Sequence, residues 1–270
     1  MAIVPSNTQF RGDTTGVPIV DKGSASTNKR AEYFTMADIA ESAGPTTNNT
    51  VYGLNAFQNN TSGNNNTAIG ETALRDNTTG YANIAVGVGA LQRSTTGIEN
   101  TAIGLISFLF NDNGSRNTSL GAYTGYNSRT SDNTYIGYRS GQESWNGVEN
   151  TAVGSEAHKS VWNSNAENNV AIGRSSLIAI SNGDDNTAVG YQSGINITTA
   201  SSNTIVGAYA DAANFSSSVI LGREATATGS NQFVVGSALY NAGAVTTAAA
   251  AQTKTWDVII NGVAEKILLA

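Results

Sequence analysis

The sequence predicts an all-β fold, a parallel β-solenoid or β-roll of about twelve short coils. Two observations lead to this prediction. The phrase "NTAIGETAL" at residues 66–74 returns as "NIAVGVGAL", "NTAIGLISF", "NTAVGSEAH", "NVAIGRSSL" and "NTAVGYQSG". Its glycine recurs at a nearly constant interval, with β-branched residues at fixed positions before it. A period of about 17 residues is too short for a domain, so each copy is a single coil.

The glycine of the phrase defines the alignment of the coils. Successive glycines are 14 to 19 residues apart, and seven of the eleven spacings are 17, which sets the usual length of a coil. The twelve glycines are Gly53, Gly70, Gly87, Gly104, Gly121, Gly137, Gly154, Gly173, Gly190, Gly207, Gly222 and Gly236.

Two β-branched columns precede this glycine. The residue directly before it is aliphatic in all coils but one, as in Ile69 and Ile103, and the residue three before it is mostly threonine, as in Thr67 and Thr101. Residues two apart lie on one face of a strand. We expect the aliphatic column to face the interior of the coil, and the threonine column to share that inward face.

An asparagine lies four residues before the glycine in ten coils. Asparagine tolerates left-handed backbone geometry, which suits a corner, and stacked amide side chains can form ladders along a solenoid axis. The ten residues are Asn49, Asn66, Asn83, Asn100, Asn117, Asn133, Asn150, Asn169, Asn186 and Asn203.

A column of small residues lies three after the glycine, as in Ala73, Ala90 and Ser107. Small side chains allow another backbone to approach closely, either the opposite wall of the coil or a neighbouring chain. We expect two short strands in each coil, joined by turns. Eleven intervals at about 4.8 Å give a shaft of roughly 53 Å.

The repeat resembles a known family. "NTAIGETAL" and its copies are similar to the head repeat of trimeric autotransporter adhesins, a left-handed parallel β-roll, and to related repeats in bacteriophage fibre proteins. The similarity covers residues 49–240 and implies a left-handed solenoid and a homotrimer. The family's usual period is nearer the 14 and 15 residues seen at the last two coils, so longer coils are expected to have longer outer loops.

The flanking segments favour a phage fibre over an adhesin. Residues 1–48 are expected to form an attachment arm, in which "FTMADIAESAGP" predicts a short helix from Thr35 to the Gly44-Pro45 stop. Residues 241–270 are expected to be a linker and a capping hairpin that turns at Asn261-Gly262, pairing Trp256 with Ile267 and Asp257 with Lys266. The chain contains no heptads and no pattern of outer-membrane strands, both of which a whole adhesin would have.

Composition excludes several functions. Only 13% of the residues are charged, the net charge is −6 and no basic cluster is present, so nucleic acid is not an expected partner. The absence of cysteine excludes thiolate metal sites. The sequence contains no run of about 18 apolar residues, so it predicts no membrane-spanning helix. "MAIVPSNTQF" does not read as a secretory signal peptide.

No motif predicts catalysis, a metal or a cofactor. The "RGD" at Arg11–Asp13 is too short to indicate an integrin ligand, and "NDNG" at 111–114 and "NGDDN" at 182–186 lack the ligand spacing of a calcium loop and are interpreted as turns. The scattered acids Glu143, Glu149 and Glu156 form no pair with a spacing typical of glycoside cleavage. We therefore expect a protein that is not an enzyme.

Aromatic residues in the turns are the best candidates for recognition, because flat amphipathic rings suit sugars and protein partners. We select Trp145 and Trp162, together with His158, the single histidine, which shares the longest coil with Trp162. Packing between chains is the alternative for the tryptophans, and a solvated loop position is the default for His158. In "LISFLF" at 105–110, Phe108 and Phe110 are expected to pack at an interface or an end.

These features together predict a homotrimeric fibre on the surface of a virion. The arm would bind a capsid or tail protein, and the solenoid would contact a glycan or protein of the host surface, without inserting into a membrane. The alternative is the head of a trimeric adhesin on a bacterial cell surface. An ice-binding solenoid is a third hypothesis, because regular threonine columns can order water, but an inward threonine column argues against it.

Overall fold

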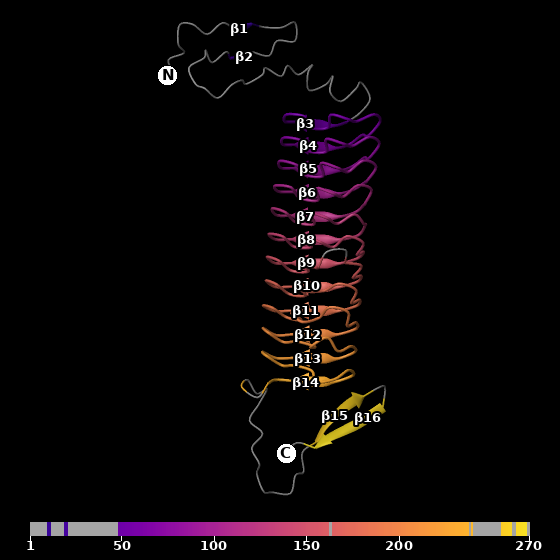
Figure 1. The fold of residues 1–270 in the computed structure, drawn as a ribbon, viewed down its shortest axis with the longest axis vertical. Helices are drawn as coiled ribbons and strands as arrows, with labels where there is room; N and C mark the ends of the chain where they lie inside the picture. Colours follow the sequence, from indigo (N-terminus) through magenta and orange to yellow (C-terminus); the bar gives the residue numbers. More distant parts are fainter. Residues whose placement is uncertain are drawn as a thin grey trace, which may run out of the picture.

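The computed structural model describes residues 10–11, 19–20, 48–161, 164–237, 239, 255–260 and 263–268. Its centre is a stack of twelve three-residue strands (Figure 1). These are β3 (Thr50–Tyr52), β4 (Thr67–Ile69), β5 (Ile84–Val86), β6 (Thr101–Ile103), β7 (Thr118–Leu120), β8 (Thr134–Ile136), β9 (Thr151–Val153), β10 (Val170–Ile172), β11 (Thr187–Val189), β12 (Thr204–Val206), β13 (Val219–Leu221) and β14 (Phe233–Val235).

The twelve strands form one parallel sheet in strict chain order, from β3 to β14. Each strand pairs with the strand of the next coil without a shift in register, so that Thr67 lies opposite Ile84 and Ile69 opposite Val86. Equivalent residues of successive coils therefore form straight columns along the axis. The predicted parallel β-solenoid is confirmed.

Each coil contains one strand, so the prediction of two strands per coil is wrong. The segment after the glycine cannot be extended, because the second and fourth residues after it have left-handed backbone angles, as in Thr72 (φ 56°) and Leu74 (φ 48°). This alternation of turn geometry recurs through most of the shaft, including β-branched residues such as Ile106 (φ 55°). The rest of the coil is a series of tight turns.

The prediction of an inward aliphatic column is also wrong. The middle residue of each strand faces the interior, so Ala68, Ala85 and Ala102 are fully buried, while Ile69 and Ile103, each directly before the glycine of its coil, are 36% and 38% exposed. The larger neighbours of these alanines point outward because alternate residues of a strand face opposite ways. The threonine column is outward for the same reason.

The small column after the glycine faces the opposite wall of the same coil. Ala73, Ala90 and Ala157 are fully buried in the single chain. Of the two possibilities that the sequence leaves open, packing inside the coil is therefore the one observed, and packing against a neighbouring chain is not needed to bury these residues.

Large and small residues compensate one another in the middle of the core. Tyr135 replaces alanine as the middle residue of β8, and glycines occupy the facing positions at Gly125 and Gly141. A Cβ atom on Gly141 would lie 2.6 Å from three carbons of the Tyr135 ring. The ring also packs against Phe108, with 5.9 Å between centroids. Phe108 is therefore an interior residue, and not the interface or end residue that the sequence suggests.

The asparagine column forms a ladder in the interior of the solenoid, as predicted. The Oδ1 of Asn83 accepts hydrogen bonds from the backbone N–H and the Nδ2 of Asn100, both at 3.0 Å, and the Nδ2 of Asn100 also donates to the carbonyl of Gly114 at 2.8 Å. The left-handed corner residue is the one before the asparagine, for example Glu99 (φ 58°), so the corner role assigned to asparagine itself is wrong.

Two further strand pairs lie in the flanking segments. β1 (Phe10–Arg11) and β2 (Ile19–Val20) pair antiparallel. β15 (Thr255–Ile260) and β16 (Val263–Leu268) also pair antiparallel, with Trp256 opposite Ile267 and Asp257 opposite Lys266. The connecting Asn261-Gly262 and the predicted helix from Thr35 lie outside the described residues, as do Gly12 and Asp13 of the "RGD".

Candidate interaction surfaces

The outward side of the sheet is a flat surface made of two columns, which we call the strand face. One column is the threonine-rich first position of each strand, and the other is the aliphatic third position. Leu120 and Val206 in the second column are 47% and 41% exposed, and Ile84 in the first is 42% exposed. A strip roughly 53 Å long and about 10 Å wide is on the order of 500 Å², and its aliphatic column is continuous along the shaft.

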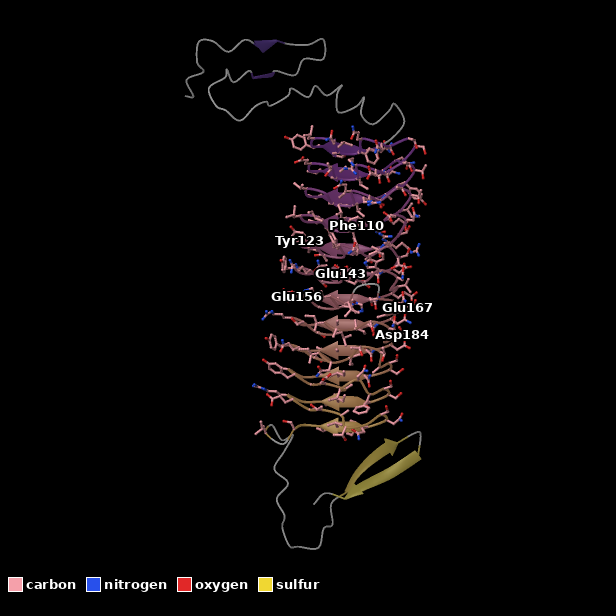
Figure 2. The ribbon with its side chains drawn as sticks, viewed as in Figure 1. Phe110, Tyr123, Glu143, Glu156, Glu167 and Asp184 are labelled. Carbon is pink, nitrogen blue, oxygen red and sulfur yellow. The ribbon has the colours of Figure 1, made fainter. Side chains whose placement is uncertain are left out.

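The two narrow edges of the solenoid differ in chemistry. Figure 2 shows Tyr123 and Glu156 at one edge, where the chain turns after the glycine, and Glu167 and Asp184 at the other. At the second edge Asp184 accepts a hydrogen bond from the backbone N–H of Glu167 at 2.9 Å, and Arg116 pairs with Asp132 at 2.6 Å. The side chains of Asp184, Arg116 and Asp132 therefore all have partners in the turns of this edge.

A group of aromatic rings and arginines lies at the first edge and the surface beside it. We call it the aromatic cluster. Its members come from four consecutive coils and form a continuous series of ring and cation contacts: Arg93, Phe110, Tyr126, Tyr123, Tyr138 and Arg139. The ring centroids are 5.1 to 6.5 Å apart, and the edge-on arrangement of Phe110 with Tyr126 is one that aromatic pairs prefer.

Backbone hydrogen bonds between coils hold the turns of the aromatic cluster in place. The N–H of Tyr123 donates to the carbonyl of Leu105 at 2.9 Å, and the N–H of Arg139 donates to the carbonyl of Ala122 at 3.1 Å. The backbone of these turns cannot shift without breaking these bonds. Tyr138 is the most exposed ring of the cluster, at 46%.

The guanidinium of Arg139 lies between aromatic rings and has no described carboxylate within ion-pair distance. Its Cζ is 5.0 Å from the Tyr138 centroid and 6.0 Å from that of Tyr123. Its Nε is buried and has no hydrogen-bond partner among the described residues. Glu156, at the same turn position of the next coil, binds Lys159 Nζ at 3.2 Å.

The histidine selected from the sequence is an interior residue. His158 has no exposed surface, so the expectation of a solvated loop histidine is wrong, and its side chain is not available to a partner outside the coil. Its Nδ1 lies 3.1 Å from the Ser160 hydroxyl, and its ring stacks at 6.4 Å on Tyr135. Burial lowers the pKa of His158 to about 4, because the interior disfavours the charged form.

Of the three predicted recognition residues, the structure describes Trp145 and His158, and it places His158 in the interior, away from an outside partner. Trp145 is half-buried, and the guanidinium of Arg129 covers its ring at 4.4 Å. Trp162 lies outside the described residues. The role of both tryptophans in recognition stays a prediction.

The acids considered for catalysis have separate neighbours. The Oε2 of Glu143 accepts a hydrogen bond from Asn127 Nδ2 at 2.6 Å, while Glu156 is paired with Lys159. Within residues 48–161 and 164–237 and the other described segments, no three His, Asp or Glu side chains are grouped so that they could hold a metal ion. In the same described part of the chain, no helix has the length and hydropathy needed to cross a membrane.

A scan against models of protein families found no match to this chain, and a search of curated proteins found none either.

Proposed function

We propose that the chain is a non-enzymatic, homotrimeric fibre of a virion, attached through residues 1–48 and contacting the host surface through its solenoid. The observation that supports the proposal most is the exposed strand face. A single chain would leave two continuous columns of aliphatic and threonine side chains in water along the whole shaft.

A second and a third copy would cover this face. Each coil presents the same pair of side chains at the same height, so a contact made by one coil repeats along the axis. Closed cyclic symmetry lets three identical faces meet about one axis without leaving a free contact. The small column of Ala73 and Ala90 no longer supports the trimer, because it is buried inside the coil.

A pair of matched leucines tests the trimer. Leu120 on the strand face is 47% exposed, and Leu105 in a turn at the narrow edge is 42% exposed. In an isolated chain, arginine at either position would remain solvated. If the strand face is the trimer interface, Leu120→Arg places three like charges near one axis and dissociates the protein, whereas Leu105→Arg does not. Sedimentation velocity measures the oligomeric state of both variants. If Leu120→Arg and Leu105→Arg sediment alike, the strand face is not the trimer interface.

The bacterial adhesin head is the alternative that shares this trimer. The two differ in location, on a virion or on a bacterial cell surface, and in what residues 1–48 bind. Cryo-electron microscopy of purified virions, with labelling by an antibody raised against the full chain, tests the choice. Label on intact bacteria and none on particles would favour the adhesin.

Ice binding is a second candidate function, and one observation favours it. Four successive strands present Thr101, Thr118, Thr134 and Thr151 on the outward face, so the inward threonine column that argued against ice binding does not exist. A surface that is buried in a trimer cannot also bind ice. Thermal hysteresis by a monomeric protein, lost in Thr134→Leu, would support ice binding and contradict the fibre.

A further inference from the structure

We propose that the aromatic cluster binds an acidic saccharide, with Arg139 bonded to a sugar carboxylate and Tyr123 and Tyr138 beneath the sugar ring. The proposal deepens the host contact suggested above and rests on it. It assigns recognition to residues other than Trp145, His158 and Trp162.

First, the turns of the coils do not need aromatic residues to form. Equivalent turn positions in other coils are filled by residues such as Thr72, Gly89 and Ser175, with the same left-handed backbone. Aromatic residues are therefore not required by the turn. Their accumulation in adjacent coils creates a platform of the kind that suits a sugar, whose C–H groups pack on ring faces while its hydroxyls stay in water.

The second step is the unsatisfied charge of Arg139. A guanidinium presents several donors in a planar fork that fits a carboxylate with two parallel hydrogen bonds. The carboxylate at the same position of the next coil, Glu156, is already bound to Lys159. Among the described residues the guanidinium therefore contacts aromatic rings and no carboxylate, and because its Nε is buried, its two terminal amino groups are the donors for an anion from outside.

The third step is the charge of the surroundings. The chain has a net charge of −6, so a general attraction for polyanions is not expected. An acidic ligand would bind where a cation lacks its own carboxylate. Arg93, at the other end of the aromatic cluster, already has Asp112 at 3.8 Å, which leaves Arg139 as the anchoring residue of the cluster.

The test uses the full chain and two probes, oligogalacturonate as the acidic saccharide and a maltooligosaccharide of the same length as the neutral one. We expect the acidic probe to bind and the neutral probe to bind at least tenfold more weakly. Arg139→Gln and Tyr138→Ala should each reduce the affinity for the acidic probe about tenfold or more, because each removes one of the two contacts. Titration calorimetry gives the affinities, and thermal unfolding checks that the variants stay folded.

Arg174→Gln is the matched control. Arg174 lies 5.8 Å from the ring of Tyr191 in a different part of the shaft, where Tyr191 packs on Tyr209 alone at 5.1 Å, and it contacts one ring where Arg139 contacts two. The control should bind the acidic probe as the native protein does. Failure of oligogalacturonate to bind at millimolar concentration, equal binding of the neutral probe, or equal losses in Arg139→Gln and Arg174→Gln would each overturn the proposal. The oligomeric state is measured separately, so this failure is distinguishable from failure of the trimer.

Discussion

The asparagine ladder is predicted to be a principal source of stability, and Asn100→Ala tests it. The Oδ1 of Asn100 accepts hydrogen bonds from the backbone N–H and the Nδ2 of Asn117, both at 3.0 Å, and its Nδ2 donates to Asn83 and to the carbonyl of Gly114. Alanine would remove these four bonds and a longer one that Oδ1 accepts from Asn111 Nδ2 at 3.5 Å. It would leave the N–H of Asn117 and the carbonyl of Gly114 without these side-chain partners in the interior.

The magnitude follows from those two backbone groups. An unsatisfied buried donor or acceptor costs about 1–3 kcal/mol, so Asn100→Ala is expected to cost about 2–6 kcal/mol per chain. At about 2–4 °C per kcal/mol for a domain of this size, the unfolding midpoint would fall by roughly 5–20 °C.

Asn113→Ala is the control. Asn113 is exposed, and its Oδ1 accepts hydrogen bonds only from the hydroxyls of Thr95 and Thr96, both at 2.9 Å. A shift of a few degrees at most is expected, because surface substitutions usually change stability by about 0.5 kcal/mol or less. Circular dichroism on heating measures both variants. If Asn100→Ala melts no lower than Asn113→Ala, the ladder does not stabilise the solenoid and the reasoning is refuted.

Three further predictions concern the core, pH and the arm. Gly141→Ala should destabilise the chain by about 2–4 kcal/mol in urea unfolding, since its Cβ would contact Tyr135 at 2.6 Å and its φ is +61°, whereas Gly229→Ala, with neighbours at 3.4 Å or more, should have little effect. Because His158 has a pKa of about 4 when folded and an ordinary value near 6.5, the unfolded chain binds a proton first as the pH falls, so stability should drop by about 2 kcal/mol between pH 7 and pH 5. His158→Leu should remove this drop, and an unchanged slope would contradict the buried neutral histidine. Deleting residues 1–48 should abolish incorporation into virions without changing the circular dichroism spectrum of the solenoid, and particles that still contain the truncated protein would exclude the arm as the anchor.

The columns of the repeat could be predicted from the sequence, but the direction in which they face could not. Spacing by two establishes that Thr67 and Ile69 share a face, yet it does not say which face. The hydrophobicity of Ile69 favours an inward face for this pair, but in the structure Ala68, between them, is the buried residue of the strand. The alanine that recurs between the two larger columns is a signal for the interior, although the same position also holds large buried residues, Tyr135 in β8 and Ile205 in β12.

The candidate site was harder to predict because its members are far apart in the sequence. Phe110, Tyr126 and Tyr138 become neighbours only when coils are stacked about 4.8 Å apart. The repeat alignment places Tyr123 and Arg139 in the same turn column of successive coils, which could have indicated the cluster. His158 was misplaced because the longest coil was expected to project outward at that point.

The molar mass of the native protein in solution tests the central claim most directly. Light scattering coupled to size exclusion should give three times 27.8 kDa for the full chain, and a smaller species for Leu120→Arg. A stable monomer at micromolar concentration, with the strand face in water, would contradict the homotrimeric fibre.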